Sequence, residues 1–124
     1  MSLQPRILLL EDSDDTRELL LRALEMLNFT VKSVASGEDA LRILESDAAK
    51  PDLILTDLNL PQMSGRDFIS AVKSRGLCPA CKIVLLSAKR EVAEEAKALG
   101  IHGGIRKPVD LDQLDTELRT ILAN

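Results

Sequence analysis

Four apolar runs of this sequence each end in residues that could do chemistry. In chain order they are 7–10 followed by Glu11 and Asp12, 53–56 by Asp57, 83–86 by Ser87, and 102–106 by Lys107. Open α/β sheets bind ligands outside the carboxyl ends of their strands. If the runs are parallel strands, carboxylates, a hydroxyl and an amine gather at one edge of a single sheet.

The acidic residues at that edge point to a divalent cation. Glu11 and Asp12 are adjacent, and Asp57 adds a third carboxylate. Carboxylates so crowded repel one another unless a cation joins them. All-oxygen ligation with room for water suits Mg²⁺, and Mn²⁺ would serve equally. We expect Asp12 to bind the metal directly and Glu11 directly or through water, and Asn59 could offer its backbone carbonyl.

A carboxylate surrounded by such groups suits phosphoryl transfer. With a metal, an ammonium and a hydroxyl about it, Asp57 can attack phosphorus and form an acyl phosphate. Lys107 would pair with Asp57 or with a phosphoryl oxygen, and Ser87 would donate to another oxygen. Taken singly, an Asp, Ser or Lys at a strand end is most often a cap or a turn residue. The prediction therefore depends on finding all of them at strand ends of one chain.

Apolar runs alternate with amphipathic stretches along the chain, which is typical of a parallel sheet covered by helices. We expect one α/β domain over residues 1–124. The expected strands are 7–10, 30–34, 52–56, 82–86 and 102–106, and the expected helices are 14–27, 37–46, 65–75, 90–99 and one after Asp110. The expected N-caps are Ser13, Ser36, Ser64 and Asp110. Spacing in the first helix places Leu19, Leu20, Ala23, Leu24 and Leu27 on one face.

Composition excludes several classes of protein. The 16 basic and 20 acidic residues give a net charge of −4, without the clustered basic excess that nucleic-acid binding needs. No apolar stretch approaches the length of a membrane span, and the start has no secretory signal. We therefore expect a cytoplasmic protein without membrane or direct nucleic-acid contact. Residues 1–3 fit a leader from an expression vector, which leaves the native start open.

Cys78 and Cys81 form a single C-x-x-C. A redox motif of the thioredoxin type follows a strand and opens a helix, whereas this pair follows an expected helix and leads into a strand. A zinc site needs more ligands, and His102, the only histidine, is distant in the sequence. We interpret the pair as loop and strand-start thiols in a reducing compartment.

Together the motifs resemble the receiver domain of bacterial two-component response regulators, of the chemotaxis-regulator type, over essentially the whole chain. The matching segments are Ile7 to Asp12, Leu53 to Pro61 with Ser64-Gly65, Leu85 to Ala88, and Lys107-Pro108. The resemblance implies a flavodoxin-like, doubly wound sheet of five parallel strands in the order 2-1-3-4-5. Five helices would cover its two faces in three layers.

By the same resemblance, Asp57 is the phosphoacceptor, and Glu11 and Asp12 form the acidic pair. Ser87 is the switch hydroxyl, and Lys107 is the active-site lysine. The donor is then a phosphohistidine on a sensor histidine kinase or a phosphotransfer protein, and an unidentified downstream protein reads the phosphorylated surface. We expect only self-catalysed phosphorylation and dephosphorylation of Asp57, without enzymatic turnover of an external metabolite, in a monomer or weak homodimer.

One position departs from the family's pattern. Receivers of this type usually carry Tyr or Phe three residues before the lysine, where the ring moves inward as the hydroxyl residue swings toward the phosphoryl group. Here that position is Gly104, and the two Phe of the chain, Phe29 and Phe68, are not close to it in sequence. With Gly103 beside it, Gly104 predicts a pliable strand that passes the signal on by backbone rearrangement or altered dynamics.

Two other classes of function stay open. Haloacid-dehalogenase-type phosphatases also combine an Asp nucleophile with Mg²⁺, a hydroxyl residue and Lys. Their nucleophile follows the first strand and has a second Asp two residues on, whereas here Asp57 follows the third strand and position 59 is Asn. The other alternative is an interaction module that keeps the fold without being phosphorylated. The complete set of site residues speaks against it, and Gly104 keeps it open.

Overall fold

A computed structural model describes residues 4–46 and 50–124 of the chain, so the interpretation of residues 1–3 lies outside the described residues. Strands and helices alternate as the sequence predicts. The strands are β1 (Arg6–Leu10), β2 (Thr30–Val34), β3 (Leu53–Asp57), β4 (Lys82–Ser87) and β5 (Gly103–Arg106). The helices are α1 (Asp14–Met26), α2 (Gly37–Glu45), α3 (Gly65–Arg75), α4 (Val92–Ala98) and α5 (Leu111–Ala123).

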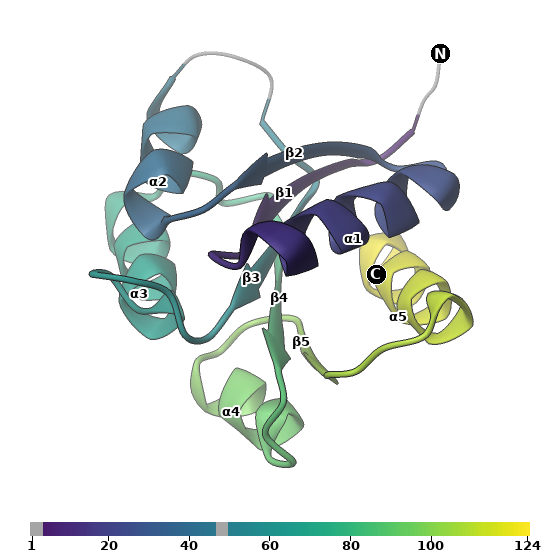
Figure 1. Ribbon diagram of the computed structural model, residues 1–124. Helices are drawn as coiled ribbons and strands as arrows, with labels where there is room; N and C mark the ends of the chain where they lie inside the picture. Colours follow the sequence, from purple (N-terminus) through teal and green to yellow (C-terminus); the bar gives the residue numbers. More distant parts are fainter. Residues whose placement is uncertain (1–3, 47–49) are drawn as a thin grey trace.

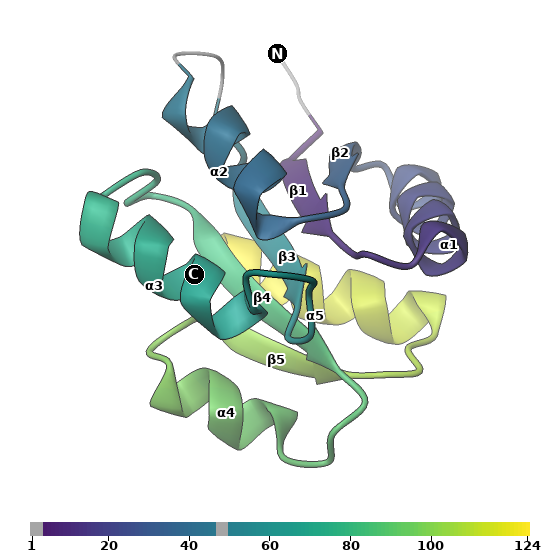
Figure 2. The same ribbon diagram turned by 60° about the vertical axis from the view of Figure 1, so that its left-hand side comes forward.

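All five strands form one parallel sheet in the order β2-β1-β3-β4-β5, which confirms the predicted topology (Figure 1). Figure 2 shows three layers, with α1 and α5 on one face of the sheet and α2, α3 and α4 on the other. The fold is therefore the flavodoxin-like α/β fold. In the described ranges, no helix is long and apolar enough to cross a membrane.

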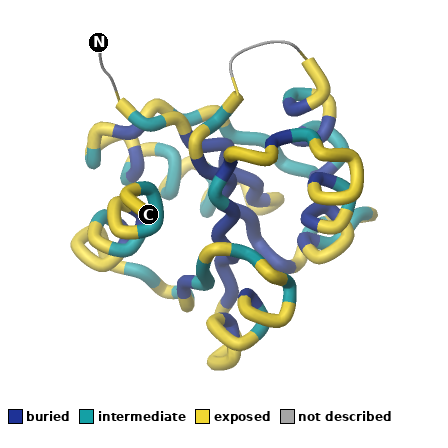
Figure 3. Tube along the Cα trace, turned by 180° about the vertical axis from the view of Figure 1, so that it is seen from behind, coloured by how far each residue is buried: buried dark blue, intermediate teal, exposed yellow. Residues whose placement is uncertain are grey.

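Successive strand residues fill two separate cores, one on each face. In β1, Ile7 and Leu9 belong to the cluster with α1 and α5, while Leu8 and Leu10 belong to the cluster with α2 and α3. Side chains of a strand point alternately to the two faces of a sheet. An uninterrupted apolar run is therefore the pattern of a strand buried on both faces. Figure 3 shows this burial along the inner strands, with exposed residues on the outer sides of the helices.

Four helices begin at the capping residues that the sequence predicts. Each cap accepts a hydrogen bond from a first-turn amide, which has no partner within the helix. These bonds join Ser13 to Thr16, Ser36 to Asp39, Ser64 to Asp67, and Asp110 to Gln113. Helix α4 differs, because it follows Glu91 without a side-chain cap and is shorter than the predicted 90–99. With no local capping signal, tertiary packing sets its ends.

The predicted apolar face of α1 is only partly buried. Leu24 is buried, whereas Leu19 is 70% exposed and Met26 is 72% exposed. Leu19 precedes Leu24 by five residues, and at about 100° per residue this separation turns its side chain away from the face that Leu24 buries. Leu19 and Met26 instead line an apolar groove of about 650 Å³ between α1 and the start of α5, together with Leu111.

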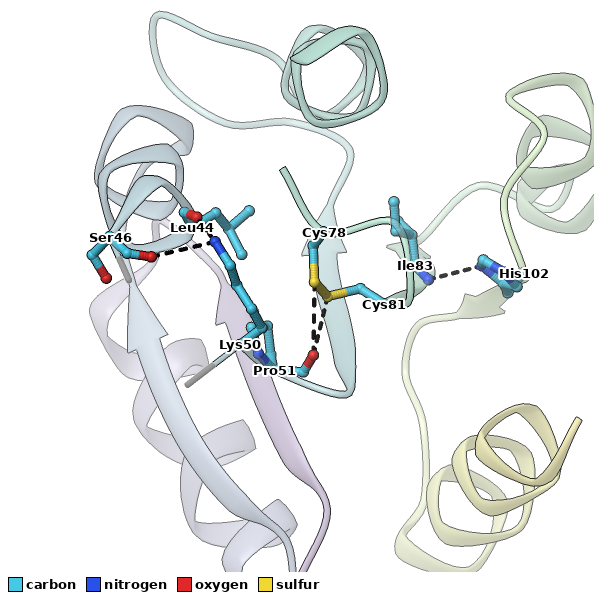
Figure 4. The surroundings of a disulfide bond; sticks show 8 residues. All are labelled: Leu44, Ser46, Lys50, Pro51, Cys78, Cys81, Ile83 and His102. Carbon is cyan, nitrogen blue, oxygen red and sulfur yellow. Dashed lines mark hydrogen bonds between the residues drawn. A yellow bond between two sulfur atoms is a disulfide. The ribbon is translucent and has the colours of Figure 1, made fainter. Parts of the chain in front are cut away.

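Cys78 and Cys81 lie in the loop before β4, as predicted, but they form a disulfide, so the prediction of free thiols is wrong. The Cys81 amide donates to the Cys78 carbonyl at 3.0 Å in a tight turn. This turn brings the two Cα atoms to 5.3 Å, a separation that a disulfide spans. Figure 4 shows both sulfur atoms facing the Pro51 carbonyl. The pair precedes β4 and therefore lies at the sheet edge opposite Ser87.

His102 hydrogen-bonds β4 with both its backbone and its ring. Its amide donates to the Ile83 carbonyl at 2.9 Å. Its Nδ1 accepts from the Ile83 amide at 3.0 Å, the bond drawn in Figure 4. Partial burial of the ring, and then the charges of Lys82 and Lys73, lower the pKa of His102 below its usual value. Because Nδ1 accepts a hydrogen bond, the neutral form of the ring carries its proton on Nε2.

We predict that His102 makes the chain less stable as the pH falls below about 6.5, the usual value for histidine. Because its pKa is lower in the folded state, the unfolded chain binds the proton first. The contribution of the neutral ring is complete above the unfolded pKa and is lost as the pH falls through the folded pKa. NMR titration of this single imidazole should give a midpoint below that of an unfolded peptide.

The control is His102→Asn, whose amide oxygen can accept the same hydrogen bond without titrating. Urea unfolding at neutral and at mildly acidic pH should show a smaller loss of unfolding free energy in the variant than in the wild type. Equal losses in the two proteins would contradict the prediction, since the carboxylates they share would then account for the whole pH dependence.

Candidate functional site

Carboxyl ends of four strands meet at one edge of the sheet and bring the predicted residues to it. Glu11 directly follows β1, Asp57 and Ser87 end β3 and β4, and Lys107 directly follows β5. The Lys107 Nζ lies 2.9 Å from Glu11 Oε1 and 3.1 Å from Asp57 Oδ2. An ammonium from one end of the chain thus bridges two carboxylates from distant segments.

The bridge lies largely out of contact with solvent. The side chain of Glu11 is 3% exposed, that of Asp57 is 13% exposed and that of Lys107 is 26% exposed. Burial by itself lowers the pKa of Lys107, but the hydrogen bonds and charges of Glu11 and Asp57 outweigh it and raise the pKa above its ordinary value. Lys107 is therefore protonated, and the bridge is charge-assisted.

A cluster of three carboxylates surrounds the bridge. One oxygen each of Glu11, Asp12 and Asp57 lies within 4.8 Å of the others, and Asp12 is the exposed member. A single ammonium does not balance three ionised carboxylates, and its contacts are with Glu11 and Asp57. Hard divalent cations prefer such all-oxygen donor sets. The residues present therefore fit Mg²⁺ or Mn²⁺, with Asp12 on the side open to water.

Close packing of α3 holds the end of β3. The Asp57 carbonyl accepts from Thr56 Oγ1 at 2.9 Å, and Asp57 Oδ1 accepts from the Asn59 amide at 3.4 Å. A Cβ on Gly65 would lie 2.3 Å from the Asp57 carbonyl oxygen, well inside van der Waals contact. Only glycine fits there, so Gly65 lets the first turn of α3 reach the backbone of Asp57.

Ser87 shares this edge, but its hydroxyl is engaged with its own loop. The residue is buried, and its Oγ accepts from the Lys89 amide at 3.1 Å. The Ser87 carbonyl accepts from the Lys107 amide at 2.8 Å, which continues the pairing of β4 with β5. The bond from Lys107 to Pro108 is cis, as the sequence allows. Ser87 is thus joined to Lys107 through the backbone.

Arg17 belongs to the site and is missed by the sequence analysis. It donates to the Glu11 carbonyl at 2.9 Å and pairs with Asp14 at 2.6 Å. Arg17 thereby fixes the backbone that carries Glu11 and Asp12. Nothing in its spacing separates it from the other charged residues of α1, so only the tertiary structure shows this role.

Comparison with known proteins agrees with this geometry. The sequence model for the response regulator receiver domain matches residues 7–119. Ethylene receptor 2 of Oryza sativa subsp. japonica is 38% identical over 120 residues, which are 94% of this chain and 16% of that protein. Transcriptional regulatory protein TctD of Salmonella typhimurium is 32% identical over 119 residues, which are 94% of this chain and 51% of that protein. The chain spans about half the length, or less, of the curated relatives it matches.

Solved structures show the same fold. Chemotaxis response regulator CheY4 of Vibrio cholerae is 27% identical and has a TM-score of 0.85, over 96% of this chain and 99% of that chain. A CheY-like receiver domain from Methylobacillus flagellatus is 29% identical with a TM-score of 0.83 and the same coverage of 96% and 99%. The chain therefore belongs to the response regulator receiver domain family, the signalling modules of two-component systems that work with sensor kinases or phosphotransfer proteins.

Proposed function

We propose that this chain accepts a phosphoryl group on Asp57 and changes its interaction surface in response. The observation that carries the proposal is the Lys107 bridge, in which the ammonium lies 3.1 Å from an oxygen of the Asp57 carboxylate. Fixed positive charge beside a nucleophilic carboxylate stabilises the oxygens of a phosphoryl group as it arrives. Membership of the receiver family supports the same assignment.

Each residue of the site has a separate part in this reaction. Glu11, Asp12 and Asp57, with the Asn59 carbonyl, would hold Mg²⁺, which when bound offsets charge on the phosphoryl oxygens. An Asp57 oxygen attacks phosphorus, and the leaving group keeps the electron pair of the bond that breaks. Lys107 and Ser87 donate to the transferred oxygens. Water later hydrolyses the acyl phosphate, so no external metabolite is turned over.

An apolar groove beside the site supports a protein as the phosphoryl donor. In the part of the chain that the structure describes, the exposed large apolar side chains are Leu19, Met26 and Leu111, and all three line this groove. Lys107 lines it as well, so a partner seated there reaches the Asp57 site. The occupant that we propose is the phosphohistidine-bearing domain of a sensor histidine kinase or phosphotransfer protein.

Incubation with acetyl phosphate and millimolar Mg²⁺ should add one phosphoryl group to the intact mass of the chain. The adduct should be labile to hydroxylamine, as an acyl phosphate is, and should not form when a chelator removes the metal. Asp57→Asn should abolish it, while Asp112→Asn, a matched change on the exposed start of α5, should leave it unchanged. A wild-type chain without an adduct would contradict the proposal, as would an adduct that persists in Asp57→Asn.

Lys107→Gln should separate metal binding from phosphoryl transfer. Removing the ammonium leaves more uncompensated negative charge around the carboxylates, so Mg²⁺ should bind at least as tightly, as measured by NMR titration. Phosphorylation by acetyl phosphate at saturating Mg²⁺ should be about 100-fold slower, the usual effect of removing one electrostatic donor to a transition state. Weaker metal binding with an unchanged rate would show that Lys107 is only structural.

A further inference from the structure

Helix α4 lies directly on the backbone of β5 because Gly104 has no side chain (Figure 2). A Cβ at Gly104 would be 2.5 Å from the Val92 carbonyl oxygen, 3.0 Å from its carbonyl carbon and 3.1 Å from its Cγ2. All three distances are shorter than van der Waals contact. The φ of Gly104 is not in the left-handed region, so space, rather than backbone conformation, requires the glycine.

Gly103 provides an internal contrast. It precedes Gly104 in the same strand and faces the other side of the sheet, where a Cβ would be 2.8 Å from Ile121 Cδ1. That atom is the end of a flexible side chain on α5, which can turn aside at small cost. The two glycines are therefore different: Gly103 meets a movable side chain, and Gly104 meets a helix backbone.

Tertiary contacts, more than local sequence, hold α4 in place. Glu91, the residue before its first turn, provides no side-chain cap. Glu95 forms an ion pair with Arg66 of α3. At the other end, Lys73 of α3 donates to the Leu99 and Gly100 carbonyls at 2.8 and 2.7 Å. A helix held from outside can shift as a unit when one of these contacts changes.

Two successive hydrogen bonds, one to the Ser87 side chain and one within the backbone, join the site to this contact. The Lys89 amide donates to Ser87 Oγ at 3.1 Å, and the Lys89 carbonyl accepts from the Val92 amide at 3.3 Å. A Ser87 hydroxyl that turns toward a phosphoryl group on Asp57 therefore disturbs Lys89 and, through it, Val92.

We propose that the contact between Val92 and Gly104 carries the phosphorylation signal in this chain, in place of an aromatic side chain. The phosphoryl group on Asp57 draws the Ser87 hydroxyl, the loop 88–91 follows, and the Val92 backbone moves over Gly104. Helix α4 then shifts relative to β5. This inference rests on the proposed function, because it requires Asp57 to be phosphorylated.

Gly104→Ala tests the inference, with Gly103→Ala as the matched control. The new methyl group displaces Val92 without any phosphoryl group, so amide NMR shifts and hydrogen exchange in α4 should change in Gly104→Ala and not in Gly103→Ala. Coupling between two sites is reciprocal. If phosphorylation favours the displaced helix, Gly104→Ala should bind beryllofluoride with Mg²⁺ about fivefold more tightly, or better, and Gly103→Ala should bind it as the wild type does.

The outcomes distinguish this inference from the function on which it rests. An altered α4 in Gly104→Ala with unchanged beryllofluoride affinity would overturn the inference alone. A wild-type chain that binds no beryllofluoride would contradict both. Circular dichroism will show whether Gly104→Ala folds. If it does not fold, the test uses the wild type, in which the amide NMR signals of Val92 and Gly104 must both shift when beryllofluoride binds. Unchanged signals would overturn the inference.

Discussion

The Lys107 ammonium compensates two buried carboxylates, and its position depends on most of the sheet. An isolated charge in the interior is strongly destabilising, and removing one partner of a buried pair leaves the other uncompensated. Pairing of Leu10 with Thr56 places Glu11 beside Asp57. The Lys107 amide, bonded to the Ser87 carbonyl, continues the pairing of β4 with β5. The Lys107 bridge therefore requires each of the pairings among β1, β3, β4 and β5 to keep its observed register.

The need to pair Lys107 with both carboxylates also favours the observed register of the strands. Both faces of β1 and β3 are apolar, so a shift by one residue would exchange one apolar face for the other. Apolar pattern alone discriminates weakly between such registers. A shift would, however, separate Glu11 or Asp57 from Lys107 and leave a buried carboxylate without its partner. The residues that make the site thus also specify the sheet.

Local signals predict most of the fold and the membership of the site. Buried strands appear as continuous apolar runs, caps are short polar side chains, and strand ends of a parallel sheet meet at one edge, so these features can be read from the sequence. Features set by packing cannot. The exposure of Leu19 depends on which side of α1 the sheet covers, and the short α4 depends on its contacts with α3. The disulfide of Cys78 with Cys81 and the contact of Arg17 with the Glu11 carbonyl join residues only three and six positions apart, but both depend on the exact path of the backbone between them.

Gly104 shows the same limit of sequence-based prediction. From the sequence, a glycine there indicates freedom of the backbone, whereas in the structure it indicates close approach of α4. The aromatic ring that receivers of this type usually carry at this position changes the burial of one side chain when it turns inward. A backbone contact instead moves every side chain of α4 together. The groove of about 410 Å³ between α4, β5 and α5 is lined by Ala93, Gly103 and Gly104 together with larger side chains such as Lys97 and Ile121. A shift of α4 relative to β5 would therefore change the width of this groove.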